Sequence, residues 1–300
     1  MHIRKRILII GSNGMLGQRL TEFYARKENV ELYLTSAEEE SFFENIDYSK
    51  LDIRDKSAVK SVIMTFFPDT IINVAAYTNV DGCETEKKLA WEINVEGVKN
   101  IALYSQGIDA HTIHISTDYV FDGKNGPYTE EDKPNPISYY GRTKLASENV
   151  LKSSGTRYTV VRTNVLFGPA KFGRPDFVKW VVNSLRAGKQ IRIVTDQFGN
   201  PTYLDDLVDG IVSIETLEAE GLYNIGGRDF LTRYEFTEEI ADFFDLDKSL
   251  ITPIKTAELN QPARRPLKSG LITDKAEREL GYNPRSINKA LRDMKRELGL

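Results

Sequence analysis

The feature that most constrains this chain is an apolar run that ends in three evenly spaced glycines. Residues 6–10 are mostly apolar, and Gly11, Gly14 and Gly17 follow at once. Such a run is typical of a strand that is buried on both faces. From residue 15 onward, apolar side chains recur every three or four positions, which predicts an amphipathic helix. The glycines therefore lie in a strand–turn–helix unit whose backbone N–H groups are suited to binding the phosphates of a dinucleotide.

Strand and helix patterns then alternate along the first half of the chain. Further strands are expected at residues 31–35, 70–75, 112–116 and 158–162, and helices at 15–26, 56–67, 87–106 and 140–153. No hairpin pattern interrupts them, and such alternation is typical of a parallel sheet covered on both faces. The sequence predicts an α/β fold with a Rossmann-like, doubly wound parallel sheet.

After residue 168 the chain becomes rich in glycine, proline and aromatic residues, which favours a less regular lobe. We therefore expect a dinucleotide-binding domain at residues 1–165 and a smaller, mixed substrate lobe at residues 166–300. Residues 221–227 include a short apolar strand pattern, and this strand is a candidate to rejoin the first sheet.

Composition limits the partners and the compartment. The 300 residues include 28% charged residues and carry a net charge of −4, so no global basic field favours nucleic acid or an anionic membrane. The single cysteine, Cys83, cannot form an internal disulfide and is expected to be a buried structural residue. No apolar run is long enough for a signal peptide or a membrane span, so we expect a cytoplasmic protein.

Two short motifs predict carbonyl chemistry. Tyr140 and Lys144 are four residues apart and therefore share one helix face. An ammonium group beside a phenol favours its ionised form, so Tyr140 is a candidate acid and Lys144 its partner, with a second role in holding the nicotinamide ribose. Thr117 and Asp118 end a predicted central strand, at the edge where such sheets bind ligands. Thr117 can donate to a carbonyl oxygen, and Asp118 can accept from a substrate hydroxyl.

The choice between NADH and NADPH is open from the sequence. The second strand ends in Thr35 and Ser36, whose hydroxyls suit either a ribose or a phosphate, whereas the acidic residues 38–40 would repel a 2′-phosphate. Asp52 and Ile53 follow the next expected strand and are candidates to contact the adenine.

Six motifs in this order resemble one family of extended short-chain dehydrogenases/reductases, the dTDP-4-dehydrorhamnose reductases. They are the glycine turn, residues 73–81, residues 116–123, Tyr140 with Lys144, residues 196–202, and Arg265 with Pro266. The resemblance extends from Arg6 to about Tyr282. It implies reduction of the C4 ketone of dTDP-4-dehydro-6-deoxy-L-mannose by NADH or NADPH, which yields dTDP-L-rhamnose.

The resemblance also implies residue roles. The residues expected to bind the cofactor are Gly11, Asn13, Gly14, Met15, Leu16, Gly17, Asp52, Ile53, Ala75, Ala76, Tyr77, Tyr140 and Lys144. Those expected to contact the nucleotide sugar are Thr78, Val80, Thr117, Asp118 and Arg265, the last through its diphosphate. No metal site is expected, because His111 and His114 are three apart in a strand and point to opposite faces.

Two positions and one segment leave alternatives open. Tyr119 stands where the related 4,6-dehydratases carry a catalytic Glu, which disfavours dehydration. Val165 stands where the rhamnose reductases usually carry a Trp against the sugar, so another nucleotide-linked keto-sugar remains an alternative. Residues 164–169 are similar to a segment of the nucleotide-sugar epimerases. A non-catalytic, NADP-binding regulatory subunit is a further alternative, and a homodimer is an open expectation.

Overall fold

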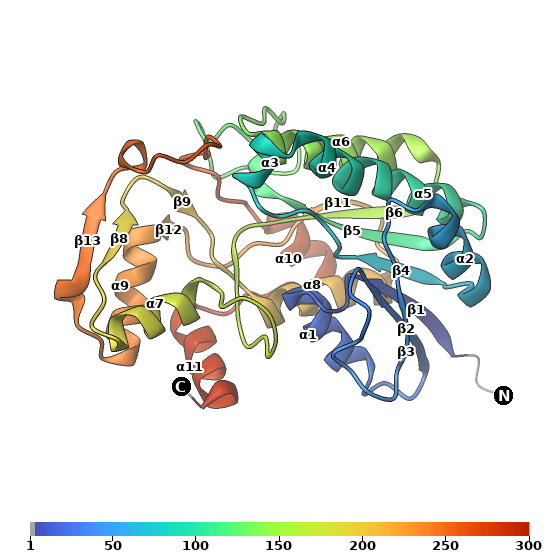
Figure 1. Ribbon diagram of the computed structural model, residues 1–300, viewed down its shortest axis with the longest axis horizontal. Helices are drawn as coiled ribbons and strands as arrows, with labels where there is room; N and C mark the ends of the chain where they lie inside the picture. The colour runs from blue at the N-terminus through green and yellow to red at the C-terminus, as the bar shows by residue number, and fades with distance from the viewer. Residues whose placement is uncertain (1–3, 300) are drawn as a thin grey trace.

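The computed structural model describes residues 4–299 and centres on a seven-stranded parallel sheet (Figure 1). In spatial order its strands are β11 (Gly221–Asn224), β6 (Tyr158–Thr163), β5 (His111–Thr117), β4 (Thr70–Asn73), β1 (Lys5–Ile10), β2 (Val30–Ser36) and β3 (Asp47–Lys50). The order reverses direction on either side of β1, as in a doubly wound fold. The predicted fold class is confirmed.

Helices cover both faces of this sheet. One face carries α1 (Met15–Tyr24), α8 (Leu204–Leu217) and α10 (Asp274–Leu280), and the other carries α2 (Lys56–Phe66), α5 (Gly97–Gln106) and α6 (Tyr139–Ser154). The helix expected at residues 87–106 is interrupted: α4 (Lys87–Trp91) and α5 are joined by a π-helical segment, Glu92–Glu96. The short α3 (Gly82–Thr85) precedes them. Within residues 4–299, no helix combines the length and apolarity that crossing a bilayer requires.

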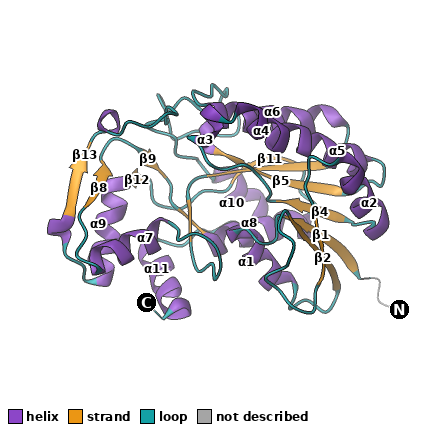
Figure 2. Ribbon diagram, in the orientation of Figure 1, coloured by secondary structure: helices purple, strands orange, loops and turns teal. Residues whose placement is uncertain are grey.

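The second lobe is built differently, from three helices and three two-stranded sheets (Figure 2). Its helices are α7 (Phe177–Arg186), α9 (Arg233–Phe244) and α11 (Ile287–Leu298), and its strand pairs are β7 (Leu166–Phe167) with β10 (Thr202–Tyr203), β9 (Phe198–Gly199) with β12 (Leu231–Thr232), and β8 (Ile191–Val194) with β13 (Ile251–Ile254). A core of its own, which includes Phe167, Phe236 and Met294, lies between these elements.

The chain crosses between the two halves more than once. The segment expected to rejoin the first sheet does so, because β11 pairs in parallel with β6. Helices α8 and α10 also come after residue 166 in the chain, yet they pack in the same core as α1. The predicted boundary between two domains at residue 165 stays a prediction.

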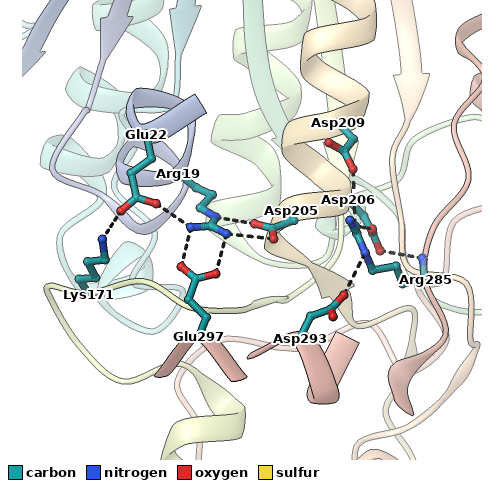
Figure 3. Close-up of polar contacts among 9 residues, drawn as sticks. All are labelled: Arg19, Glu22, Lys171, Asp205, Asp206, Asp209, Arg285, Asp293 and Glu297. Carbon is teal, nitrogen blue, oxygen red and sulfur yellow. Dashed lines mark hydrogen bonds and ion pairs between the residues drawn. The ribbon is translucent and has the colours of Figure 1, made fainter. Parts of the chain in front are cut away.

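An ion network joins α1, α8 and the C-terminal helix α11 (Figure 3). Arg19 on α1 donates to Asp205 at 2.5 and 3.0 Å and to Glu297 at 2.7 and 2.8 Å. Beside it, Arg285 pairs with Asp206 at the start of α8. These contacts hold the last helix against the sheet-bearing half.

Candidate active site

A cavity of about 510 Å³ lies at the carboxyl ends of the central strands, where the second lobe faces the sheet. The sheet half contributes the glycine turn and the residues that come after β4 and β5. The end of β6 and the segment after it contribute residues 163–166. The second lobe contributes residues 197–201, 231–233 and 266–269 in part. This edge is where open α/β sheets bind their ligands.

The glycine turn fits an anionic group. Gly11 has φ +93°, and a Cβ there would lie 2.8 Å from the backbone nitrogen of Ala75. A Cβ at Gly17 would lie 2.2 Å from the carbonyl oxygen of Gly11. Helix α1 begins after Gly14 with no side-chain cap and no acidic residue in its first turn, and Ser12 Oγ is buried without a partner. Uncapped N–H groups at a helix start are suited to a dinucleotide pyrophosphate.

Asn13 connects this turn to the segment after β2. Its Nδ2 donates to the carbonyl oxygen of Glu40 at 2.8 Å, and its Oδ1 accepts from the N–H of Phe42 at 3.2 Å. Glu38 lies within 3.5 Å of Asn13 Nδ2 and accepts a hydrogen bond from Ser36 Oγ. A carboxylate is thus placed at the end of β2, where an adenosine ribose would bind.

Helix α6 brings Tyr140 and Lys144 to the cavity. Ser138 caps the helix by accepting from the N–H of Gly141 at 3.1 Å. A Cβ at Gly141 would lie 2.1 Å from the carbonyl oxygen of Tyr119, so this glycine permits the close approach of α6. Both Tyr140 and Lys144 line the cavity.

The electrostatics of this pair differ from the expectation. Burial lowers the pKa of Lys144 to about 8. Burial and the neighbouring Asp118 raise the pKa of the Tyr140 phenol, although a hydrogen bond with Thr117 acts in the opposite direction. We expected Lys144 to lower the pKa of Tyr140. In the structure the Lys144 Nζ lies 3.1 Å from His114 Nε2, and the loss of hydration on burial is the main influence on the pKa of the phenol.

Thr117 and Asp118 end β5 and form a polar cluster with the second lobe. Thr117 Oγ1 donates to Asp118 Oδ1 at 3.0 Å, and Ser269 Oγ donates to Asp118 Oδ2 at 2.5 Å. Burial raises the pKa of Asp118 to about 6, although these hydrogen bonds act in the opposite direction. Asp118 is therefore a carboxyl group that titrates near neutral pH at the wall of the cavity.

Several residues that line the cavity have no role predicted from the sequence. Tyr119 stands edge-on to Tyr140, with ring centroids 5.9 Å apart. Ser269, Asn164 and Arg233 come from distant segments. Arg233 and Lys144 are the cationic side chains among the described residues of the cavity wall. Adjacency to Asp118 was an available indication for Tyr119, whereas no local pattern identifies Ser269 or Arg233.

The site residues predicted from the sequence divide into those that line the cavity and those that do not. The cavity wall includes Gly14, Met15, Leu16, Gly17, Ala76, Thr78, Val80, Thr117, Asp118, Tyr140 and Lys144. The residues outside that wall are Gly11, Asn13, Asp52, Ile53, Ala75, Tyr77 and Arg265. Val165, the residue at the usual Trp position, is part of the wall.

Arg265, Asp52 and Ile53, which lie outside the cavity wall, contact other residues of the protein. Arg265 donates to both carboxylate oxygens of Asp81, at 2.5 and 2.8 Å, so its charge is already balanced. Asp52 pairs with Arg54, whose guanidinium lowers the pKa of the carboxyl group. Ile53 packs against Gly97, where a Cβ would lie 2.6 Å from it.

The remaining candidates for metal or thiol chemistry are separate from the cavity. In the part of the chain that the structure describes, no group of three or more His, Cys, Asp or Glu side chains is arranged to hold a metal ion. His111 hydrogen-bonds with Thr159 at 2.8 Å. Cys83 is fully buried, and burial raises the pKa of its thiol to about 11, as expected for an unreactive structural residue.

Comparison with known proteins identifies relatives over the whole chain. The family model described as the RmlD substrate binding domain matches residues 5–299. A dTDP-4-dehydrorhamnose reductase of Aggregatibacter actinomycetemcomitans is 32% identical, with 97% of this chain and 98% of the relative covered. A probable dTDP-4,6-dihydroxy-2-methyloxan-3-one 4-ketoreductase of Streptomyces antibioticus is 33% identical, with coverage of 96% and 94%. The crystal structure of dTDP-4-dehydrorhamnose reductase from Bacillus anthracis in complex with NADP superposes with a TM-score of 0.87 at 32% identity, over 98% and 99% of the chains.

Proposed function

The chain belongs to the dTDP-4-dehydrorhamnose reductase family, defined by the RmlD substrate-binding domain, and from this we propose that it reduces the C4 ketone of dTDP-4-dehydro-6-deoxy-L-mannose to dTDP-L-rhamnose. The observation that carries the proposal is one cavity in which Thr117, Tyr140 and Lys144 lie beside an uncapped helix N-terminus. NADH or NADPH is the reductant, in line with the NADP complex of the Bacillus anthracis relative.

The proposed roles depend on what each side chain can donate. Bound NAD(P)H supplies the hydride that reaches C4 of the sugar. Tyr140 donates its phenolic proton to the C4 oxygen, and Thr117 donates a hydrogen bond to the same oxygen. Lys144 binds the hydroxyls of the nicotinamide ribose, and its positive charge favours the phenolate that Tyr140 becomes.

The substrate contacts need one revision of the sequence-based expectation. Asp118 is suited to accept from a sugar hydroxyl, because it is an ionised carboxylate above about pH 6. For the diphosphate we propose Arg233 in place of Arg265, since Arg233 lies in the cavity wall and Arg265 pairs with Asp81. Guanidinium groups bind phosphate oxygens through paired hydrogen bonds.

Two observations concern the identity of the sugar. Val165 offers less apolar surface than the Trp usual in rhamnose reductases, and the Streptomyces antibioticus relative is named for a different dTDP-linked ketone. A related 4-keto sugar nucleotide is the second candidate substrate.

Turnover by the isolated protein tests the function. We expect stoichiometric oxidation of NADH or NADPH when dTDP-4-dehydro-6-deoxy-L-mannose is added, with dTDP-L-rhamnose as product. Binding of NADP without oxidation in the presence of any keto-sugar would support a regulatory subunit. Interconversion of sugar epimers with no net consumption of reduced cofactor would support an epimerase. Two further predictions are a homodimer, which light scattering tests, and a cytoplasmic location, which cell fractionation tests.

A further inference from the structure

Four buried polar side chains lie together beneath the catalytic residues, between β4, β5 and α6. His114 and Ser147 are 0% exposed, and Asn73 and Lys144 are 1% exposed. His114 Nδ1 lies 3.1 Å from Asn73 Nδ2. His114 Nε2 lies 3.0 Å from Ser147 Oγ and 3.1 Å from Lys144 Nζ. Because His114, Ser147 and Asn73 are shielded from water, their side-chain hydrogens are expected to point at protein acceptors, whereas Lys144 also faces the cavity.

The orientation of Asn73 determines one ring nitrogen of His114. Asn73 Oδ1 accepts from the backbone N–H of Ala75 at 3.2 Å, so the amide nitrogen is the atom that faces the imidazole. An amide nitrogen only donates. His114 Nδ1 must therefore be the acceptor, and it carries no hydrogen.

Ser147 determines the other ring nitrogen. Its Oγ lies 2.7 Å from the carbonyl oxygen of Lys144, which can only accept, so the hydroxyl hydrogen lies between these two oxygens. Ser147 Oγ then faces His114 with lone pairs alone. His114 Nε2 must therefore carry the hydrogen, and the imidazole is the neutral Nε2–H tautomer.

In this tautomer the single hydrogen on Nε2 is shared between two neighbours, Ser147 Oγ at 3.0 Å and the side-chain nitrogen of Lys144 at 3.1 Å. An ammonium group has three donors and no lone pair, whereas a neutral amine can accept from Nε2–H. We propose that His114, oriented by Asn73 and Ser147, is a positioning residue that favours the neutral amine form of Lys144 over the ammonium form before the cofactor binds. This inference rests on the proposed function, in which Lys144 contacts the hydroxyl oxygens of the nicotinamide ribose once the cofactor is bound. Those oxygens accept hydrogen bonds and so favour the ammonium form of Lys144. Cofactor binding is thus coupled to proton uptake by Lys144.

The charges near Lys144 are consistent with this assignment. Besides Lys144, the titratable or charged groups on α6 are Tyr139, Tyr140, Arg142, Glu148 and Lys152. The elements packed against α6 carry Cys83, Glu84, Lys87, Lys88, Glu92, Glu96, Lys99, Tyr104, His111, His114, Asp118, Tyr119, Tyr158 and Arg162. Of these groups, His114 and Glu148 interact with the charge of Lys144. Glu148 favours the ammonium form, but it pairs with Arg162 at 2.7 Å and accepts from Ser116 Oγ at 2.5 Å. Burial lowers the pKa of Lys144 to about 8, and burial together with Lys144 places the pKa of His114 well below its ordinary value.

The first test is the tautomer itself. With three histidines in the chain, the imidazole ¹⁵N signals of the protein without added nucleotide are assignable through the variants His114→Gln and His111→Gln. We expect a proton on Nε2 of His114 and none on Nδ1 from pH 6 to 9. An Nδ1–H tautomer or an imidazolium in this range would overturn the proposal.

The second test is the titration of Lys144, followed through its ¹⁵Nζ signal and assigned with Lys144→Met. We expect a midpoint about 8 in the unaltered protein, and His114→Leu should raise it by about one pH unit, a tenfold change in proton affinity. His114→Gln should keep the midpoint, because its amide N–H replaces Nε2–H while its oxygen accepts from Asn73. The control His111→Gln lies beside Thr159 and should also leave it unchanged.

An identical midpoint in His114→Leu and the unaltered protein would overturn the proposal. If His114→Leu fails to fold, the tautomer and the His114→Gln titration decide instead. Calorimetric titration of NADPH at pH 8.5 in two buffers of different ionisation enthalpy should show net proton uptake, reduced in His114→Leu. None of these measurements requires turnover. A protein with the expected tautomer and midpoint that reduces no keto-sugar would therefore contradict the proposed function alone.

Discussion

The two walls of the cavity are built in different ways. The cofactor wall consists of short segments at or directly after the ends of β1, β4 and β5, together with Tyr140 and Lys144 on α6. The strand before each segment places the side chains of that segment, and one helix face places Tyr140 and Lys144. The substrate wall brings together residues near positions 165, 198, 232 and 269, which are joined by two-residue strand pairs, an isolated bridge between Phe198 and Lys268, and side-chain contacts. One wall is determined by the backbone ladder of a sheet, the other by tertiary packing.

The walls also differ in where their charges lie. Beneath the cofactor wall, Glu148 and Arg162 form a buried pair that is 9% and 3% exposed. The lobe that carries the substrate wall is held to α1 by the more accessible Arg19 network, in which Glu297 is 33% exposed (Figure 3). Buried pairs depend on both partners because an unpaired buried charge is costly, whereas accessible pairs contribute little. We therefore expect a substitution in the buried pair beneath the cofactor wall to lower the free energy of unfolding more than a substitution in the accessible Arg19 network.

The largest expected effect is on the reaction. Tyr140→Phe removes the proposed acid from the cofactor wall, so kcat/KM for the keto-sugar should fall by about 10²- to 10⁴-fold, the usual contribution of a positioned acid. The dissociation constant for NADPH, measured by fluorescence, should stay unchanged. Tyr119→Phe is the matched control because Tyr119 is the neighbouring cavity tyrosine, and its effect should be much smaller. Equal rates for Tyr140→Phe and the unaltered enzyme would refute the assignment.

The next effect is on stability. Arg162→Met leaves Glu148 buried without its partner, so the free energy of unfolding should fall by about 3–5 kcal/mol. Urea denaturation measures this change. Arg157→Met, which loses exposed pairs with Glu218 and Glu220, should cost about 1 kcal/mol or less. Similar losses for both variants would contradict the contrast between buried and accessible pairs.

Asp118 lies where the two walls meet, and the effect of its replacement on the free energy of unfolding should depend on pH. Its pKa in the folded protein is about 6, above the unfolded value, so the neutral form is favoured and the carboxylate weakens folding at higher pH. Asp118→Asn should therefore raise the free energy of unfolding at pH 8, by up to on the order of 3 kcal/mol, and the gain should vanish as the pH falls towards 4. Turnover should nevertheless decrease, because an amide is a weaker acceptor for a sugar hydroxyl. A gain that grows as the pH falls would contradict the raised pKa.

A smaller effect should separate the two walls kinetically. Val165→Trp restores an aromatic surface to the substrate wall, so KM for dTDP-4-dehydro-6-deoxy-L-mannose should fall by about threefold to tenfold, equivalent to roughly 1 kcal/mol. KM for NADPH should stay the same. Steady-state kinetics with each substrate varied in turn provide both values. A higher KM for the sugar nucleotide would instead favour a different keto-sugar.

The smallest expected effect concerns the attachment of the lobe. Glu297→Gln removes one of the carboxylates around Arg19, while Asp205 and Glu22 remain. The free energy of unfolding should fall by about 0.5–1 kcal/mol at low salt and by less at high salt. Thermal unfolding at two salt concentrations measures it. A loss as large as that of Arg162→Met would show that the network, and not the core of the lobe, holds α11.

Much of the fold could be predicted from the sequence because its information is local. The apolar run before Gly11, the helical period after it and the repeated alternation each reflect backbone hydrogen bonding within one element, and the order of these elements determines the sheet. The spacing of Tyr140 and Lys144 determined that both face one way on α6, and both reach the cavity.

The tertiary structure decided the rest, since distant segments meet through packing that leaves no local pattern. Ser269 reaches Asp118 across 151 positions, Arg265 is paired with Asp81, and Arg233 enters the cavity at the start of α9. The same holds for the proton on His114, which depends on hydrogen bonds from a neighbouring strand and a facing helix. The sequence by itself determined the cofactor wall, because a strand fixes the position of the residues directly after it. Only tertiary packing determined the substrate wall and the charge of the groups beside it.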